Sequence, residues 1–304
     1  MAELLAPLVD PFRFPFMQRA LLEVLVLALL AGVVGVHVVL RRLAFASDTL
    51  THTVFPGVAV AFLLGQSIAL GALVAGALSA VLLALLTTVR RVSQDAALAV
   101  LLTSFFAVGV VLVSRTSGYT ANLSSFLVGD LLAVTTRQLA ETAAVAAVAL
   151  GGLAALHKEL VLAAFDPAGA RAMGYRTLLL DLALNLVIAL VVVAAVRAVG
   201  VVLVIALLVV PAVTAQLVTE RFAAMAVVSV SVAGLGGYFG LLVSFHGSVE
   251  YGLRLASGAT VVVALVVLFG LVATVSAAVR ALRRRAAGDG PGRVPAGTVP
   301  GAVS

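Results

Sequence analysis

The sequence predicts an all-α fold, a polytopic transmembrane helical bundle of about nine spans. Three observations support this prediction: 63% of the 304 residues are hydrophobic, only 11% are charged, and the mean hydropathy is +1.25. A soluble protein of this length could not bury so much apolar surface, and runs of about 20 apolar residues recur along the chain. The sequence therefore indicates a multi-pass membrane protein.

Charged or turn-forming residues separate the expected spans. Arg41–Arg42 and Arg90–Arg91 end two of them, and Gly65–Gln66 and Gly200 form short turns. Residues 115–138 are more polar and predict an external loop with a re-entrant or partial helix. The total is eight to ten spans, depending on whether part of this loop crosses the membrane. The nine spans are 17–40, 46–64, 68–89, 96–113, 139–156, 177–196, 201–218, 222–243 and 252–279.

Three regions follow from this pattern. Residues 1–16 contain three prolines and mixed charge and predict an N-terminal surface segment, and 17–279 form the transmembrane domain. Residues 280–304 form a basic cytoplasmic tail, and the glycine and proline at its end predict disorder. We expect no cleaved signal peptide, because the first apolar run is long and several others follow it.

Charge and cysteine content exclude several classes of function. The arginines that give the net charge of +6 lie between apolar spans, on the side that becomes cytoplasmic, so they indicate lipid contact and an external N-terminus rather than nucleic-acid binding. With no cysteine, the chain has no disulfide and no thiolate metal site. It also lacks the GxxxxGK[ST] phosphate-binding loop, so any ATPase is a separate polypeptide.

The stretch 41–57 carries the strongest candidate site. Asp48 and His52 stand four residues apart, so on a helix they share one face. Pro56, four residues beyond His52, has no N–H to donate to the His52 carbonyl, and its ring should kink the helix there. A carboxylate, an imidazole and a free carbonyl within about one turn suit a divalent cation.

Two other interpretations of this pair remain open on spacing alone. Asp48 lies near a helix start, where a carboxylate is favoured by about 0.3–1 kcal/mol, and His52 could be an interior histidine that donates to a carbonyl. The simple topology also places Asp48 close to the cytoplasmic boundary. Either the first span ends early, or the second is tilted and broken.

A second polar segment lies between two spans on the predicted cytoplasmic side. In FDPAGARAMGYR, 165–176, Asp166 suits a helix N-cap, Pro167 the first helical position and Gly174 the end. The short helix between them, with the small residue Ala170, could bind in a groove of another protein. A capped loop helix without a partner is the alternative.

Further polar residues have weaker assignments. Pro211 should kink the span 201–218 by freeing the Leu207 carbonyl. Helix pairing is expected for Glu23, Asp181 and Asn185, with a place along a pathway as the alternative. Asp130 and Glu141 bracket the predicted re-entrant region and could attract a cation at the outer mouth. A solvated loop is expected for His246 and Glu250, with metal contact as the alternative, and a cytoplasmic flank for His157.

Four stretches in order resemble the permeases of the ABC-3 family, which import zinc, manganese and iron(II) with ATP. The stretch RRLAFASDTLTHTVFPGVA, 41–59, is similar to the family signature, and FDPAGARAMGYR is similar to its coupling helix for the ATPase. FLVGDLL, 126–132, and LLVVPAVTAQL, 207–217, resemble two further family stretches. The resemblance extends over 17–279 and implies a fold like that of vitamin B12 and siderophore permeases.

The resemblance implies a homodimer in the cell membrane, a cytoplasmic ABC ATPase and an extracellular metal-binding protein. It places Asp48 and His52 in the path of a transported Zn²⁺ or Mn²⁺, with Fe²⁺ as a third cargo, and no bound cofactor. It assigns Asp166, Ala170 and Gly174 to the coupling helix. Ser47 and His37 depart from the family pattern, where glycine and an apolar residue are expected.

Two rival functions are weighed against this interpretation. An importer of a larger chelate, of siderophore or cobalamin type, should have a wider path without an acid–histidine pair. An intramembrane enzyme would need a catalytic motif, and the sequence has no credibly spaced Ser/His dyad, no paired acidic motif and no HExxH. The chain is therefore predicted to be a transporter subunit and not an enzyme.

Overall fold

The computed structural model of the chain describes residues 7–89, 91–114, 129, 131–253 and 255–288. Throughout this part the regular structure is helical, which confirms the predicted fold class. Two shorter helices, α3 (Ala44–Thr53) and α4 (Phe55–Leu63), replace the predicted span 46–64. Among the described residues, eight helical segments are long and apolar enough to cross a membrane: Pro15–Leu40, Ile68–Leu86, Gln94–Leu112, Thr136–Ala155, Thr177–Val196, Ala198–Val218, Phe222–Val249 and Ser257–Leu282.

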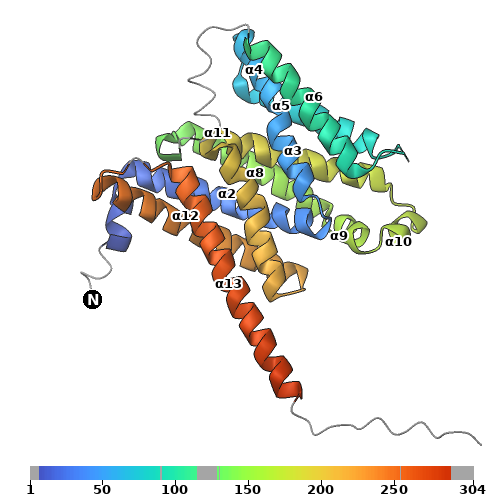
Figure 1. Ribbon diagram of the computed structural model, residues 1–304. Helices are drawn as coiled ribbons and strands as arrows, with labels where there is room; N and C mark the ends of the chain where they lie inside the picture. Colours follow the sequence, from blue (N-terminus) through green and yellow to red (C-terminus); the bar gives the residue numbers. More distant parts are fainter. Residues whose placement is uncertain (1–6, 90, 115–128, 130, 254, 289–304) are drawn as a thin grey trace, which may run out of the picture.

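Helix α2 (Pro15–Leu40) lies at the centre of the bundle. It packs against α8 (Thr136–Ala155), α11 (Thr177–Val218) and α12 (Phe222–Val249) (Figure 1). Two glycines allow these close approaches: a Cβ on Gly32 would lie 2.9 Å from backbone atoms of Val230, and one on Gly35 would overlap the Leu208 carbonyl.

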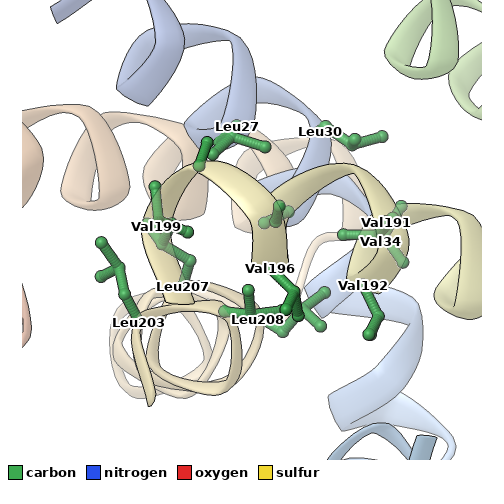
Figure 2. Close-up of a cluster of buried hydrophobic side chains, with 14 of the residues drawn as sticks. Leu27, Leu30, Val34, Val191, Val192, Val196, Val199, Leu203, Leu207 and Leu208 are labelled. Atoms are coloured by element: carbon green, nitrogen blue, oxygen red, sulfur yellow. The ribbon is translucent and has the colours of Figure 1, made fainter. Parts of the chain in front are cut away.

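The core between α2 and α11 is a layer of aliphatic side chains. Figure 2 shows side chains of α2 directed at α11, where successive turns present valine and leucine. These residues are buried because both helices are apolar on all sides and each covers the other. The labelled members are Leu27, Leu30, Val34, Val191, Val192, Val196, Val199, Leu203, Leu207 and Leu208.

A second group of helices lies beside this core. Helices α3 and α4 pack against α5 (Ile68–Leu86) and α6 (Gln94–Ser114), at the upper right of Figure 1. The turn between α4 and α5 contains Gly65 at φ 62°, as expected from the predicted turn. Helix α4 crosses α5 where Gly57 meets Gly71, so the two backbones approach closely.

The predicted external loop is described only in part. Residues 115–128 and 130, which include the expected partial helix and Asp130, lie outside the described residues. After a short 3-10 helix, η2 (Leu131–Ala133), helix α8 begins at Thr136, earlier than the predicted start at 139. The reason is a capping box, in which Thr135 and Gln138 satisfy each other's backbone N–H groups.

Helix α11 contains both spans that the sequence predicts at 177–196 and 201–218. Its break is at Gly200, with φ 76° and ψ 164°, while α11 continues through Pro211 to Val218. The kink at Pro211 stays a prediction.

The chain ends differ from the predicted regions. Helix α2 begins at Pro15, inside the predicted segment 1–16, and a 3-10 helix, η1 (Asp10–Arg13), precedes it. Helix α13 (Ser257–Gly288) packs on α11 and α12 near its start and then extends away from the bundle (Figure 1). It continues past 279, so the first residues of the predicted tail are helical, and 289–304 lie outside the described residues.

Candidate metal centre

Helix α3 is polar in sequence yet mostly buried. Most of its hydroxyl groups donate to carbonyls of the same helix, as Ser47 Oγ does to Ala44 at 2.8 Å and Thr51 Oγ1 to Asp48 at 2.6 Å. The buried Thr49 Oγ1 has no partner among the described residues. Because the Ser47 and Thr51 hydroxyls are satisfied locally, they need no polar partners on α11 and α6, between which α3 lies. What remains exposed is a narrow stripe of Phe45, Asp48 and His52, which we call the α3 stripe.

Asp48 and His52 lie next to each other on this stripe, as the spacing predicts. The Asp48 Oδ1 and His52 Nε2 atoms are 3.6 Å apart, and about a third of each side chain is exposed (34% and 35%). Two ligand atoms that each lie about 2.1 Å from a tetrahedral ion are separated by about 3.4 Å. The observed separation is therefore close to the spacing that one shared cation requires.

The helix breaks directly after this pair. Helix α3 ends at Thr53, and Pro56 stands in the first turn of α4, where its missing N–H is not needed. The His52 carbonyl, expected to be free, accepts the N–H of Val54. Since a carbonyl oxygen has two lone pairs, it retains one that could still act as a ligand.

The described residues of one chain do not complete a metal site here. Among the described residues, no group of three or more His, Cys, Asp or Glu side chains could hold a metal ion. Zinc takes four ligands and manganese commonly takes more, so Asp48 and His52 could provide only part of a coordination shell.

Most of the other polar residues are bound within the chain. Thr142 Oγ1 donates to the Glu23 carboxylate at 2.8 Å, and Arg41 pairs with Asp181, so the predicted helix pairing is confirmed for these two acids. Glu141 accepts a hydrogen bond from Arg137 at 2.9 Å.

Two histidines lie away from the α3 stripe. His37 is 1% exposed and packs against Phe222, with ring centroids 4.8 Å apart, and lies edge-on to His157 at 6.0 Å. His246 contacts Glu250 at 2.9 Å through Nδ1 and the Pro7 carbonyl at 2.8 Å through Nε2. It therefore holds the N-terminal segment against α12.

The segment 165–176 forms a short, doubly capped helix. Asp166 Oδ1 accepts the Gly169 N–H at 2.8 Å at the start of α10 (Pro167–Ala172), which Pro167 begins. At its end Gly174 has φ 87°, and Tyr175 N–H bonds back to the Ala170 carbonyl at 3.0 Å, which is the Schellman arrangement. These caps fix a helix too short to be stable alone.

One side of α10 packs on the protein and the other faces outward. Ala170 is fully buried, whereas Phe165, Met173 and Tyr175 are exposed large side chains around the helix. Helix α10 follows α9 (His157–Phe165), and both project from the side of the bundle where α2 ends (Figure 1). Such an exposed apolar projection is typical of a surface that binds another protein.

Comparison with known proteins agrees with this architecture. Residues 13–276 match the model of the ABC 3 transport family. The chain belongs to that family. It is a membrane permease subunit of an ABC transporter, a multi-pass protein of the cell membrane and not an enzyme, and ATP hydrolysis takes place in a separate subunit.

Individual relatives cover most of the chain. The manganese transport system membrane protein MntC of Halalkalibacterium halodurans is 32% identical over 258 residues, 85% of this chain and 86% of that protein. The chelated iron transport system membrane protein YfeD of Yersinia pestis is 32% identical over 237 residues, 78% and 80% of the two chains.

Two solved structures have the same fold. PsaBC from Streptococcus pneumoniae, in complex with Fab, aligns with a TM-score of 0.76 at 30% identity and covers 88% of this chain and 94% of its own. An inward-facing ABC transporter assigned to the metal-chelate type aligns with a TM-score of 0.66 at 16% identity, over 84% and 85% of the two chains. The second likeness concerns the fold alone.

The sequence interpretation of this ABC 3 permease missed one interior contact. Arg41, assigned only to the membrane boundary, is 8% exposed in its side chain and pairs with Asp181 at 2.6 Å. Burial lowers the pKa of the Arg41 guanidinium, and the neighbouring Asp181 carboxylate opposes that shift. No local spacing could reveal this pair, because its members are 140 residues apart.

Proposed function

We propose that this chain is the permease of an ATP-driven importer of divalent metal ions, zinc or manganese, with iron(II) as the further candidate. The observation that supports this best is the pair of Asp48 and His52 at the α3–α4 break, 3.6 Å apart and partly exposed. Ligation by imidazole and carboxylate without sulfur suits either metal and does not separate them. The names of the relatives, which refer to manganese and chelated iron, support the same class of cargo.

In this proposal a second copy of the chain supplies the missing ligands. Two copies related by a two-fold axis through the α3 stripe would bring two carboxylates and two imidazoles together, the number that zinc requires. The exposure of Phe45 beside them, 61%, supports contact of this stripe with a partner surface. The site should bind the metal ion only briefly, because a transport site must also release its ion.

Helix α10 is the proposed docking element for the cytoplasmic ATPase. Its capped ends make it rigid, and Phe165, Met173 and Tyr175 offer apolar side chains to a groove in the partner. ATP binding and hydrolysis would move α10, and the spans would rock between outward and inward access. An extracellular metal-binding protein would deliver the ion to the outer side.

Uptake of radioactive zinc and manganese in a strain without its own importer tests this function. Asp48→Ala and His52→Ala should each lower uptake by at least about tenfold, as expected from the loss of groups that control metal affinity. Assembly with the ATPase should remain. Asp95→Ala, which removes an exposed carboxylate from the start of α6, is the matched control and should keep uptake.

Two results would contradict the proposal. Full uptake by both Asp48→Ala and His52→Ala would remove the metal site. Transport of an intact iron chelate, with no uptake of free ions, would instead favour the chelate importer.

A further inference from the structure

Arg41 connects three helices that are distant in the sequence. Its Nη1 donates to Asp181 Oδ1 of α11 at 2.6 Å, and its Nη2 donates to the Leu160 carbonyl of α9 at 3.0 Å. Arg41 itself stands at the end of α2. A planar guanidinium can satisfy two acceptors at once, which an ammonium group on a flexible stem does less well.

The position of Arg41 places it between the two functional elements. On one side, α9 runs into α10 through the single residue Asp166. On the other side, only Arg42 and Leu43 separate Arg41 from α3, and Asp48 follows one turn later. Arg42 has φ 57°, so the chain makes a sharp turn there and leaves little slack between Arg41 and α3.

A cavity beside this ion pair contains a second acceptor. It measures about 370 Å³ and is lined by Arg41, Asp181, Asn185, Thr87 and Gln94. Asn185 is 5% exposed, and its Oδ1 has no hydrogen-bond partner among the described residues. Arg41 Nε is likewise unpaired within this part of the chain.

The unpaired donor and acceptor line the same cavity and allow a second arrangement of these side chains. Asn185 follows Asp181 by four residues, so it lies one turn further along the same face of α11. A guanidinium that moved from Asp181 toward Asn185 would give the amide oxygen a donor and leave the Asp181 carboxylate, 53% exposed, to water. Buried polar groups without partners are costly, so two alternative pairings are a physical basis for two states.

We propose that Arg41 is the positioning residue that transmits movement of α10 to the metal-bearing helix α3. When α9 and α10 move, Arg41 leaves Leu160 and Asp181, bonds Asn185, and draws the start of α3 along α11. The inference rests on the proposed import function, and it adds the route by which the ATPase acts on Asp48 and His52.

The first experiment compares transport with ATP use in liposomes that contain the complete transporter. Arg41→Gln and Asn185→Leu should lower the ratio of metal imported to ATP hydrolysed by about tenfold, within the usual range for coupling between two sites. Arg41→Lys keeps the charge but not the double contact and should be only partly active. Arg42→Gln removes an exposed charge from the adjacent position and should leave the ratio unchanged.

The second experiment follows α3 without using transport. The chain has no cysteine, so spin labels can be placed at Ala44→Cys, the partly exposed first residue of α3 outside the α3 stripe, and at the exposed Val227→Cys on α12. The distance between the labels should differ between the nucleotide-free and ATP-bound complexes, and in Arg41→Gln it should be the same in both.

This role would be overturned if α3 still moved with nucleotide in the Arg41→Gln complex. It would also be overturned if the ratio of metal imported to ATP hydrolysed were unchanged in Arg41→Gln and Asn185→Leu. An equal loss of uptake and ATP hydrolysis would also overturn it, because that pattern indicates a structural defect. None of these three results would affect the metal site, which the Asp48 and His52 variants test separately.

Discussion

The crossing of α4 over α5 gives a sharp prediction about packing next to the candidate site. Gly57 directly follows Pro56, and it faces Gly71 of α5. A Cβ at Gly57 would overlap the Gly71 carbonyl and lie 2.5 Å from the Cβ of Ala75, and a Cβ at Gly71 would lie 2.5 Å from the Cβ of Ala61. Neither helix therefore has room for a methyl group at this point.

The expected cost of Gly57→Ala follows from these contacts. Two carbon atoms need about 3.5 Å, so the helices must separate by about 1 Å. Overpacking of this kind costs about 1–3 kcal/mol, and the obstacle is backbone, which cannot change rotamer. The helix propensity of alanine returns about 1 kcal/mol at most. Because a backbone obstacle cannot rotate away, the upper part of that range applies, about 2–3 kcal/mol, and subtracting about 1 kcal/mol leaves a net destabilisation of about 1–2 kcal/mol.

Thermal unfolding of the purified transporter in detergent measures this effect. Gly57→Ala and Gly71→Ala should each lower the midpoint, and the double variant should lose less than the sum, because one separation of the helices relieves both contacts. Gly151→Ala is the control, since in the described structure nothing lies within 4 Å of its Cβ position. It should be neutral or stabilising. A Gly57→Ala midpoint equal to that of the parent chain would refute the close crossing.

Three further predictions concern the ends and the interior of the bundle. Gly174→Val forces a branched side chain into a backbone with φ 87°, so it should weaken association with the ATPase in a pull-down. Gly270→Val is the control, because its Cβ position has open space among the described residues, and it should not weaken that association. Thr142→Val leaves the fully buried Glu23 carboxylate without its hydrogen bond, so it should lower the free energy of unfolding by about 1–3 kcal/mol in the same assay. An unchanged midpoint would contradict that hydrogen bond. His246→Ala removes the contact with the Pro7 carbonyl, so added protease should cleave the N-terminal segment faster than in the parent chain.

The sequence predicts the helices well because their signals are local. Apolar runs, the arginine pairs and the turns at Gly65 and Gly200 depend on neighbouring residues, so the order of the spans follows from them. The span predicted at 46–64 is the exception, because it forms two shorter helices. The caps of α10 are local as well: Asp166 and Gly174 act on backbone groups within a few residues. The position of Asp48 and His52 on one face of the helix follows from their spacing of four residues alone.

Tertiary structure decided what these elements contact, because such contacts join residues that no sequence window includes. Only the folded chain brings Arg41 to Leu160 and Asp181, 119 and 140 residues away, and leaves the α3 stripe uncovered. The sequence by itself determined an all-helical membrane protein through composition and apolar runs, and an acid–histidine pair through helical spacing. The permease assignment came from the resemblance of four stretches to a known family. The three-dimensional packing determined that Arg41 lies between α9 and α11, since burial and distance arise only after distant helices meet.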